Sequence, residues 1–418
     1  MTQEALSLTG RWPATFVSLR YPNYRRWFIG QSLSLMGTWM QSVAQGWLVY
    51  DLTGSKLALG MISFAGSIPT LFLMLPAGAI ADRVPKRRLL MATQSVMMLL
   101  AFVLALLTAT KALQVWQVAL LAFGLGVCNS FDAPSRLALA VELVEDRRDL
   151  QNAIALNATM FNMARVVGPA LGGIALAAVG PAWCFGLNGL SFLAVLIALS
   201  GMRLPGDVPG ARSSERFVEQ VRAGLRYVWG SHAGVVRTVV ALVAVSSLFA
   251  MSYAVLMPVY AADVLKVGEA GLGALNAAVG AGALVGSLTL AVLSRYSRKG
   301  LQLTIGSFVF PLALLGFAVS RSFPLSLALL GVAGFGFVTQ NATSNALVQS
   351  IVPDALRGRV MSVYSLMFFG TAPFGALTAG VLAQAFGPTV AVLFGAGVAL
   401  AFSLFVFFAV PSLRRMQI

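Results

Sequence analysis

Charged residues are scarce in this sequence. Only 10% of its 418 residues are Asp, Glu, Lys or Arg, whereas 58% are hydrophobic. Soluble globular domains carry about 25% charged residues, and the mean hydropathy of +0.84 departs from them in the same direction. The composition therefore excludes a soluble domain of any size and indicates an integral membrane protein.

Histidine and cysteine are scarcer still, with one His and two Cys in the chain. His232 falls in the longest hydrophilic segment, so it cannot carry protons inside the membrane. Cys128 and Cys184 fall within apolar runs, which argues against a disulfide framework and against a metal site. We therefore expect no metal and no other cofactor.

The sequence also lacks the groups that ATP-driven pumps and membrane enzymes use. It contains no Gly-x-x-x-x-Gly-Lys-Ser/Thr loop, so a nucleotide is not the expected energy source. An enzyme embedded in the membrane needs clustered acids, histidines or a nucleophile beside a base. The apolar runs hold one clear carboxylate and no histidine, and this disfavours an enzyme.

Long apolar runs are abundant. A spanning helix takes about 20 residues, and twelve runs in 418 residues leave room for a short loop after each span. Most basic residues lie in turns on one side; the exceptions are Lys56, Lys111, Lys266 and Arg321 in loops on the other side, and Arg165 within a span. The positive-inside rule explains this distribution, and it accounts for the net charge of +15 better than nucleic-acid binding does.

The second half of the chain weakly repeats the first. A shift of 208 residues places Gly78 on Gly286, Asp146 on Asp354 and Gly172 on Gly380. Two pseudo-symmetric six-helix bundles, related by an axis along the membrane normal, produce such a repeat. The predicted fold is an all-α integral membrane protein with twelve transmembrane helices and both termini in the cytoplasm.

This fold divides the chain into five parts. They are a cytoplasmic N-terminal segment (1–26), a first bundle (27–202), a cytoplasmic linker (203–237), a second bundle (238–410) and a cytoplasmic tail (411–418). Within the linker, residues 213–227 alternate apolar and charged positions as an amphipathic surface helix does. The seventh span is predicted as one helix over residues 238–262.

A charged turn separates the second and third spans. Residues 78–88 read Gly-Ala-Ile-Ala-Asp-Arg-Val-Pro-Lys-Arg-Arg, and their four cations place the turn on the cytoplasmic side. This pattern resembles the signature loop of the major facilitator superfamily of transporters. It departs from that loop at Pro85, where the family usually has glycine.

The resemblance implies a latch that holds the two halves closed on the cytoplasmic side. Asp82 would accept hydrogen bonds from the start of span 11 near Arg359, where the helix dipole is positive. Glu142, at the end of span 4, would pair with Lys86 or Arg87. The alternative is a solvated loop that only sets topology, although an acid serves no such purpose. The complete set of gating candidates is Gly78, Asp82, Arg83, Lys86, Arg87, Glu142 and Arg359.

Span 5 contains the sequence Gly168-Pro169-Ala170-Leu171-Gly172-Gly173. It resembles the antiporter motif that exporting members of the superfamily carry in this span. Small residues at this spacing let two helices approach closely, and the proline bends the helix. Gly168, Pro169, Gly172 and Gly173 therefore also fit a simple packing motif.

Residues 132–136 with 164–169, and residues 352–359 with Pro373 and Gly375, resemble bacterial siderophore exporters typified by the enterobactin exporter. Macrolide efflux pumps and a lysophospholipid flippase look related as well. The resemblance implies a monomeric secondary exporter in the bacterial inner membrane. It would move a siderophore-like or drug-like small molecule by alternating access in exchange for protons, without nucleotide or nucleic acid. A lysophospholipid flippase of the same fold is the alternative.

Three charged residues inside the membrane are candidates for proton coupling. Asp132 and Arg136 lie four residues apart on span 4, and they could form no more than a local ion pair. Arg165 lies near the middle of span 5, where an unpaired charge costs about 3 kcal/mol or more. Asp132, a backbone carbonyl or an anionic substrate must compensate it. Asp132 is the acid expected to neutralise Arg165 when the cavity is empty.

Two polar stripes predict a central substrate cavity, because lipid cannot satisfy polar groups inside a membrane. The first stacks on one face of span 1, and the second lies on span 10 between residues 339 and 345. For span 10, interhelical hydrogen bonding is the alternative. The expected cavity residues are Ser34, Thr38, Gln41, Gln45, Asn129, Gln340, Asn341, Ser344 and Asn345.

Overall fold

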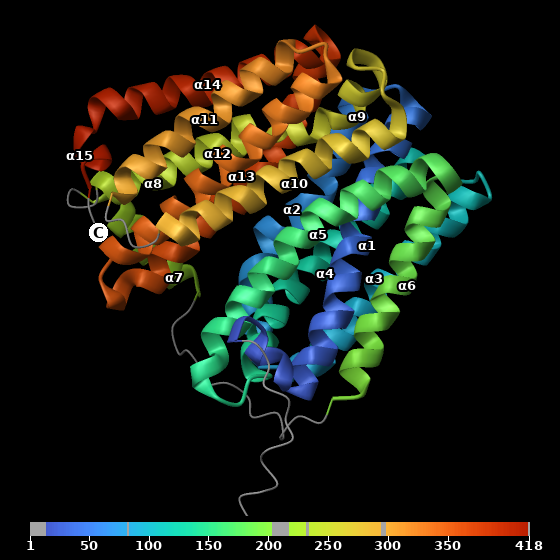
Figure 1. Ribbon diagram of the computed structural model, residues 1–418, viewed down its shortest axis with the longest axis horizontal. Helices are drawn as coiled ribbons and strands as arrows, with labels where there is room; N and C mark the ends of the chain where they lie inside the picture. The colour runs from blue at the N-terminus through green and yellow to red at the C-terminus, as the bar shows by residue number, and fades with distance from the viewer. Residues whose placement is uncertain (1–13, 82, 203–216, 231–233, 294–297, 417–418) are drawn as a thin grey trace, which may run out of the picture.

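The computed structural model describes residues 14–81, 83–202, 217–230, 234–293 and 298–416, which form helices joined by short turns (Figure 1). The first half contains α1 (Pro22–Thr53), α2 (Lys56–Ala81), α3 (Lys86–Ala109), α4 (Val115–Glu142), α5 (Leu150–Val179) and α6 (Pro181–Ser200). The second half contains α8 (Gly234–Val245), α10 (Gly268–Val292), α11 (Lys299–Val319), α12 (Phe323–Ile351), α13 (Asp354–Phe386) and α14 (Pro388–Ala409). Short helices η2 (Ala14–Arg20), η3 (Arg147–Asp149), α7 (Phe217–Trp229) and α15 (Pro411–Arg414) lie at their ends.

Eleven helical segments of the described chain are long and apolar enough to cross a membrane. Helix α1 is not among them, because its polar residues lower its mean hydropathy. Its 32 residues nevertheless pack against α5 and α6 as a twelfth spanning helix. The all-α, twelve-helix fold predicted from the sequence is confirmed.

The two bundles meet along two helix pairs, α5 with α10 and α2 with α13. Glycines allow the close approach at both places. A Cβ atom on Gly173 would lie 2.6 Å from the Cα of Gly273, and one on Gly60 would lie 3.0 Å from the Cα of Gly380. Because the 208-residue repeat places α5 on α13, the two interfaces are equivalent halves of one symmetric arrangement.

The molecule has two distinct ends. We call the end that bears the 83–88 turn, the η3 turn and α15 the basic end, and the other the opposite end. In Figure 1 the bundles lie together toward the upper right, at the opposite end, and they diverge toward the bottom and the left, at the basic end. The described chain both begins and finishes at the basic end.

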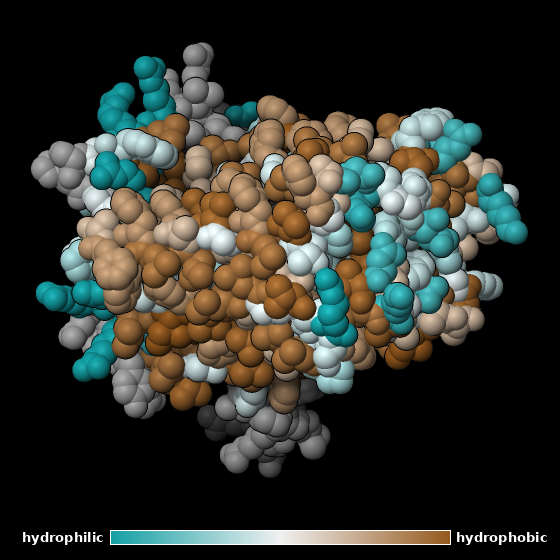
Figure 2. Space-filling model, turned by 90° about the horizontal axis from the view of Figure 1, so that it is seen from above, coloured by the Kyte–Doolittle hydropathy of each residue, from teal (hydrophilic) through white to brown (hydrophobic). Residues whose placement is uncertain are grey.

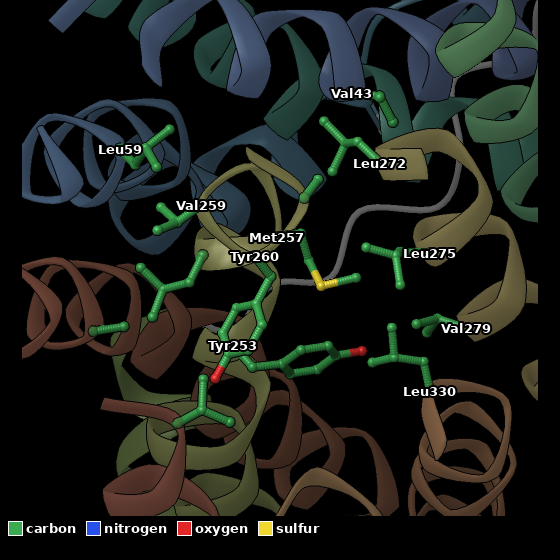
Figure 3. Packing of buried hydrophobic residues seen from close by; sticks show 14 of the residues in the cluster. Val43, Leu59, Tyr253, Met257, Val259, Tyr260, Leu272, Leu275, Val279 and Leu330 are labelled. Carbon is green, nitrogen blue, oxygen red and sulfur yellow. The ribbon is translucent and has the colours of Figure 1, made fainter. Parts of the chain in front are cut away.

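The predicted seventh span is present within the apolar segment Gly234–Val264, but its backbone is not one regular helix. Instead of one helix over 238–262, α8 continues into a π-helical turn η4 (Ser246–Ala250), a 3₁₀ segment η5 (Met251–Leu256), the short α9 (Met257–Val259) and a second π-helical turn η6 (Tyr260–Val264). Pro258 contributes to this irregularity, because proline has no N–H to donate to the preceding turn. In Figure 3, the labelled side chains of this segment lie between Leu59 of α2 and Leu275 of α10.

Hydrophobic side chains cover the middle of the face in Figure 2, while hydrophilic side chains gather toward its two ends. This is the surface that a bilayer requires, since lipid surrounds the middle and water surrounds the ends. Helix α7 lies at the basic end and packs on α13, where a Cβ atom on Gly224 would lie 2.4 Å from the carbonyl oxygen of Arg359. It occupies most of the predicted amphipathic helix; residues 213–216 and His232 lie outside the described residues.

Candidate functional site

A cavity of about 270 Å³ lies within the first bundle, between α1, α2 and α4. Most of its wall is apolar, and we call it the polar cavity after the polar side chains that line the rest. Four of the expected cavity residues line it: Thr38, Gln41, Gln45 and Asn129. Gln41 is held in place because its Oε1 accepts a hydrogen bond of 2.6 Å from Nδ2 of Asn188 on α6. Ser34, the fifth residue expected from the first bundle, is 2% exposed and does not line this cavity.

The polar residues of α12 lie elsewhere. Gln340 and Ser344 are buried inside the second bundle, and Nε2 of Gln340 donates a 2.7 Å hydrogen bond to Oγ of Ser246 on η4. The backbone carbonyl of Asn341 accepts a hydrogen bond of 3.1 Å from the Tyr364 hydroxyl, and Oδ1 of Asn345 accepts one of 2.5 Å from Gln349. None of the four lines the cavity of the first bundle. For Gln340 the alternative of interhelical hydrogen bonding fits better.

Arg165 lies between the two bundles. Its guanidinium carbon is 5.9 Å from the ring centre of Trp39 on α1 and 5.7 Å from that of Phe337 on α12. Its backbone carbonyl lies against Gly280 of α10, where a Cβ atom would be 2.6 Å away. Both rings present π faces that attract a cation. Arg165 therefore contacts side chains of both halves at once.

The expected pairing of Arg165 with Asp132 is wrong for this conformation. No carboxylate of the described residues lies within 4.0 Å of the Arg165 guanidinium. Asp132 is 1% exposed and has other partners: Oδ1 accepts hydrogen bonds from Thr93 (3.1 Å) and Gln94 (2.8 Å), and Oδ2 pairs with Arg136 at 3.6 Å. The two charges therefore lie at different sites. Asp132 binds side chains of α3 and α4, whereas aromatic rings rather than an acid cover Arg165.

Aromatic side chains of the second bundle continue away from Arg165. The ring centres of Phe337 and Phe310 are 5.4 Å apart, and Phe310 meets Tyr253 edge to face at 6.4 Å. On the other side, Phe337 and Phe368 are 6.3 Å apart. These residues come from η5, α11, α12 and α13, and we call the connected rings the aromatic wall (Tyr253, Phe310, Phe337 and Phe368); Phe337 is the member whose ring lies over the Arg165 guanidinium.

At the basic end, Nζ of Lys86 lies 2.6 Å from Oε1 of Glu142, which is one of the two pairings expected there. Arg87 instead donates a 2.9 Å hydrogen bond to the carbonyl of Ser200, at the end of α6. Arg83 is exposed, and a Cβ atom on Gly78 would have no described neighbour within 4 Å. Asp82 lies outside the described residues.

The glycine motif of α5 contacts both bundles. A Cβ atom on Gly168 would lie 2.6 Å from Cβ of Trp39, and one on Gly172 would lie 3.0 Å from Cα of Met40, both on α1. Toward the second bundle, the carbonyl of Pro169 and the backbone of Gly173 pack against Gly273. The motif thus places α5 against α1 on one side and α10 on the other.

Three hydrogen bonds join the two halves at the opposite end. The Tyr50 hydroxyl of α1 donates to Oδ2 of Asp263 on η6. Oε1 of Gln384 on α13 accepts from the backbone N–H groups of Lys56 (3.0 Å) and Leu57 (3.4 Å), at the start of α2. The Gln384 bonds also cap the first turn of α2, where N–H groups lack partners within the helix.

Sequence reasoning missed these bonds and the aromatic wall. Tyr50, Asp263 and Gln384 lie at span ends, where polar residues are common. No pattern in the sequence therefore indicates which partners they bind. Phe310, Phe337 and Phe368 lie in apolar runs in which any hydrophobic residue is expected. Only the rotation of each helix about its axis tells which rings face Arg165.

Comparisons with known proteins agree on the kind of molecule. The family model described as "Transmembrane secretion effector" matches residues 13–417. The multidrug efflux pump Tap of Mycolicibacterium fortuitum is 30% identical over 359 residues, which cover 84% of this chain and 87% of the pump. The staphyloferrin A transporter of Staphylococcus aureus is 25% identical, with 86% and 89% covered. The enterobactin exporter EntS of Shigella boydii is 25% identical, with 82% and 81% covered.

The fold is also shared with solved transporter structures. The bacterial homologue of the human lysosomal transporter Spinster, in an inward-facing and unoccupied conformation, superposes with a TM-score of 0.68. The superposition covers 97% of each chain, at 13% sequence identity. At this identity the likeness concerns the fold alone.

Proposed function

The chain belongs to the transmembrane secretion effector family of the major facilitator superfamily, and from this premise we propose that it exports a small anionic or amphipathic molecule by alternating access. Its efflux relatives include a multidrug pump and an enterobactin exporter. The observation that carries the proposal is Arg165, a cation near the centre of α5. It lies against aromatic rings of both halves, and no carboxylate of the described residues lies within 4.0 Å of its guanidinium. An anionic group of the substrate would supply the missing counter-charge.

In this proposal the basic end faces the bacterial cytoplasm. The positive-inside rule places the Lys- and Arg-rich turns there, in an inner membrane with both termini inside. Hydrogen bonds from Tyr50 to Asp263 and from α2 to Gln384 hold the opposite end together. The described conformation would then accept substrate from the cytoplasm, and export would require these outer contacts to break.

Topology fusions test this orientation. Phosphatase fused after Lys111 or Arg321 should be active, because that enzyme works outside the cytoplasm, whereas green fluorescent protein fused after Arg414 should fluoresce. A fusion at His232 should also report the cytoplasm. A reversed pair of reporters would contradict the proposed orientation.

We assign the polar cavity to substrate and the Asp132 site to protons. Thr38 and Gln41 line the cavity on α1, and Trp39, which stacks on Arg165, lies between them in sequence. Asp132 ties α4 to α3 through Thr93 and Gln94, and all three groups are nearly inaccessible. Protonation of Asp132 would weaken its ion pair with Arg136 and change how α3 and α4 are held together.

Asp132→Asn should remove the response of efflux to a pH gradient, because asparagine cannot take up or release a proton. The matched control is Asp354→Asn, since Asp354 also pairs with an arginine of its own helix but its side chain is 87% exposed. Efflux rates would be compared in acidic and alkaline medium at equal expression. A pH response retained by Asp132→Asn would exclude Asp132 as the coupling acid.

The function itself is tested by accumulation assays. Cells with and without the protein would be loaded with siderophores, drugs and fluorescent anions, and spheroplasts would be offered lysophospholipid. Lower retention of a small anionic or amphipathic compound is the expected result. Uptake of lysophospholipid without export of any small molecule would identify a flippase and overturn the proposal.

A further inference from the structure

A groove of about 970 Å³ lies between α1 and α6, toward the basic end. Arg26, Ile29, Gly30 and Leu33 line it from α1, and Ile197 and Ala198 line it from α6. It is separate from the polar cavity, which lies between α1, α2 and α4. None of the residues assigned above to substrate, protons or gating lines this groove.

The walls of the groove are apolar and open to the surroundings. Ile29, Leu33 and Ile197 are 56%, 50% and 63% exposed. Between them the two helices approach closely at Gly30, where a Cβ atom would lie 2.9 Å from the carbonyl oxygen of Ala194. In a membrane-spanning chain such a surface contacts lipid, and a groove between two helices can hold one flexible hydrocarbon chain.

The end of the groove nearest the basic end is positively charged. Nη1 of Arg26 donates a 2.9 Å hydrogen bond to the carbonyl of Gly201, just beyond α6. A guanidinium has five N–H donors, and within the described residues this bond is the one that Arg26 makes. No carboxylate of the described chain lies within 4.0 Å of Arg26. The contact with Gly201 fixes the guanidinium beside the groove and leaves donors for an anion.

We propose that this groove binds an anionic phospholipid of the cytoplasmic leaflet. Its acyl chain would lie against Ile29, Leu33 and Ile197, and its phosphate would meet Arg26 at the headgroup level. A guanidinium matches phosphate oxygens with two parallel donors. A lipid seated there would join the basic ends of α1 and α6, and α1 carries the polar residues of the cavity.

Lipid retention on the purified full-length protein tests the charge requirement. Native mass spectrometry would compare phosphatidylglycerol with phosphatidylcholine. Arg26→Gln should lower phosphatidylglycerol retention about fivefold, the factor that one basic residue near an anionic headgroup supplies. Arg25→Gln is the matched control, because Arg25 is exposed and adjacent in sequence but does not line the groove. It should retain the lipid as the parent protein does.

A second pair of variants tests the acyl-chain site. Ile197→Trp should fill the groove and displace the lipid, whereas Ile174→Trp on α5 should not, although both isoleucines are 63% exposed. Equal retention in Arg26→Gln and Arg25→Gln would overturn the proposal. So would equal losses in the two tryptophan variants, or a loss of phosphatidylcholine in Arg26→Gln as large as that of phosphatidylglycerol.

Discussion

Arg165→Ala is expected to abolish export. The variant removes the cation that faces both halves, and with it the charge-assisted hydrogen bonds proposed for the substrate. Such bonds contribute about 1.5–3 kcal/mol each, so the loss of two of them should lower efflux by about a hundredfold or more, which is no detectable export in cells. Initial efflux rates in cells would be compared at equal amounts of membrane-inserted protein. Arg148→Ala, which removes an exposed cation at the basic end, is the control and should export normally.

Two milder variants separate the parts of this site. Arg165→Lys keeps the charge but loses the planar donors, so export of an anionic substrate should be weakened rather than lost. Phe337→Leu keeps an apolar side chain but removes the ring of the second bundle that contacts Arg165. It should also weaken export, with Arg165 itself intact. Normal efflux by Arg165→Ala would make the arginine structural and move the substrate site to the polar cavity alone.

Gly173→Ala is expected to cause the second large loss. Its new methyl group would lie 2.6 Å from Cα of Gly273 and 2.9 Å from the carbonyl oxygen of Glu269, both backbone atoms that cannot turn aside. The helices α5 and α10 would have to separate, at a cost of about 1–3 kcal/mol or more. Export should fall strongly because the closed opposite end is the state that would accept substrate from the cytoplasm.

Gly186→Ala is the matched control for this substitution. Gly186 lies inside α6, and a Cβ atom on it would have no neighbour within 4 Å in the part of the chain that the structure describes. Alanine also favours a helix more than glycine does. Thermal stability in detergent and efflux in cells would be measured for both variants. If the two behave alike, the contact of α5 with α10 does not limit transport.

Length and hydropathy were enough to predict the helical fold, because a bilayer imposes both on every span. They do not determine how each helix is rotated about its axis. The predicted pairing of Asp132 with Arg165 is wrong for that reason. The sequence shows that the two residues lie on adjacent spans, but it does not show that Asp132 turns toward Thr93 and Gln94 of α3. The polar run of α12 shows the same limit, since a cavity wall and an interhelical hydrogen bond require the same residue types.

The seventh span is present within Gly234–Val264, but its irregular backbone was not predicted, and for a different reason. Its sequence is apolar and favours a helix, and Pro258 is the one residue in it that indicates a local break in the hydrogen bonding. The 3₁₀ and π-helical turns depend on packing against other helices, among them α10, α13 and α14. Local composition does not contain that information. The four residues lining the polar cavity were easier to anticipate, because polar side chains stacked on a spanning helix must face something other than lipid.

The irregular seventh span also has a mechanical consequence. A 3₁₀ helix rises about 2.0 Å per residue and an α-helix about 1.5 Å, so the six residues of η5 extend about 3 Å further than six α-helical residues would. Conversion of η5 to α-helix would shorten the span by that amount and rotate Tyr253 relative to Asp263. Such a conversion would therefore change the separation between Tyr253 in the aromatic wall and Asp263, which accepts the hydrogen bond from Tyr50.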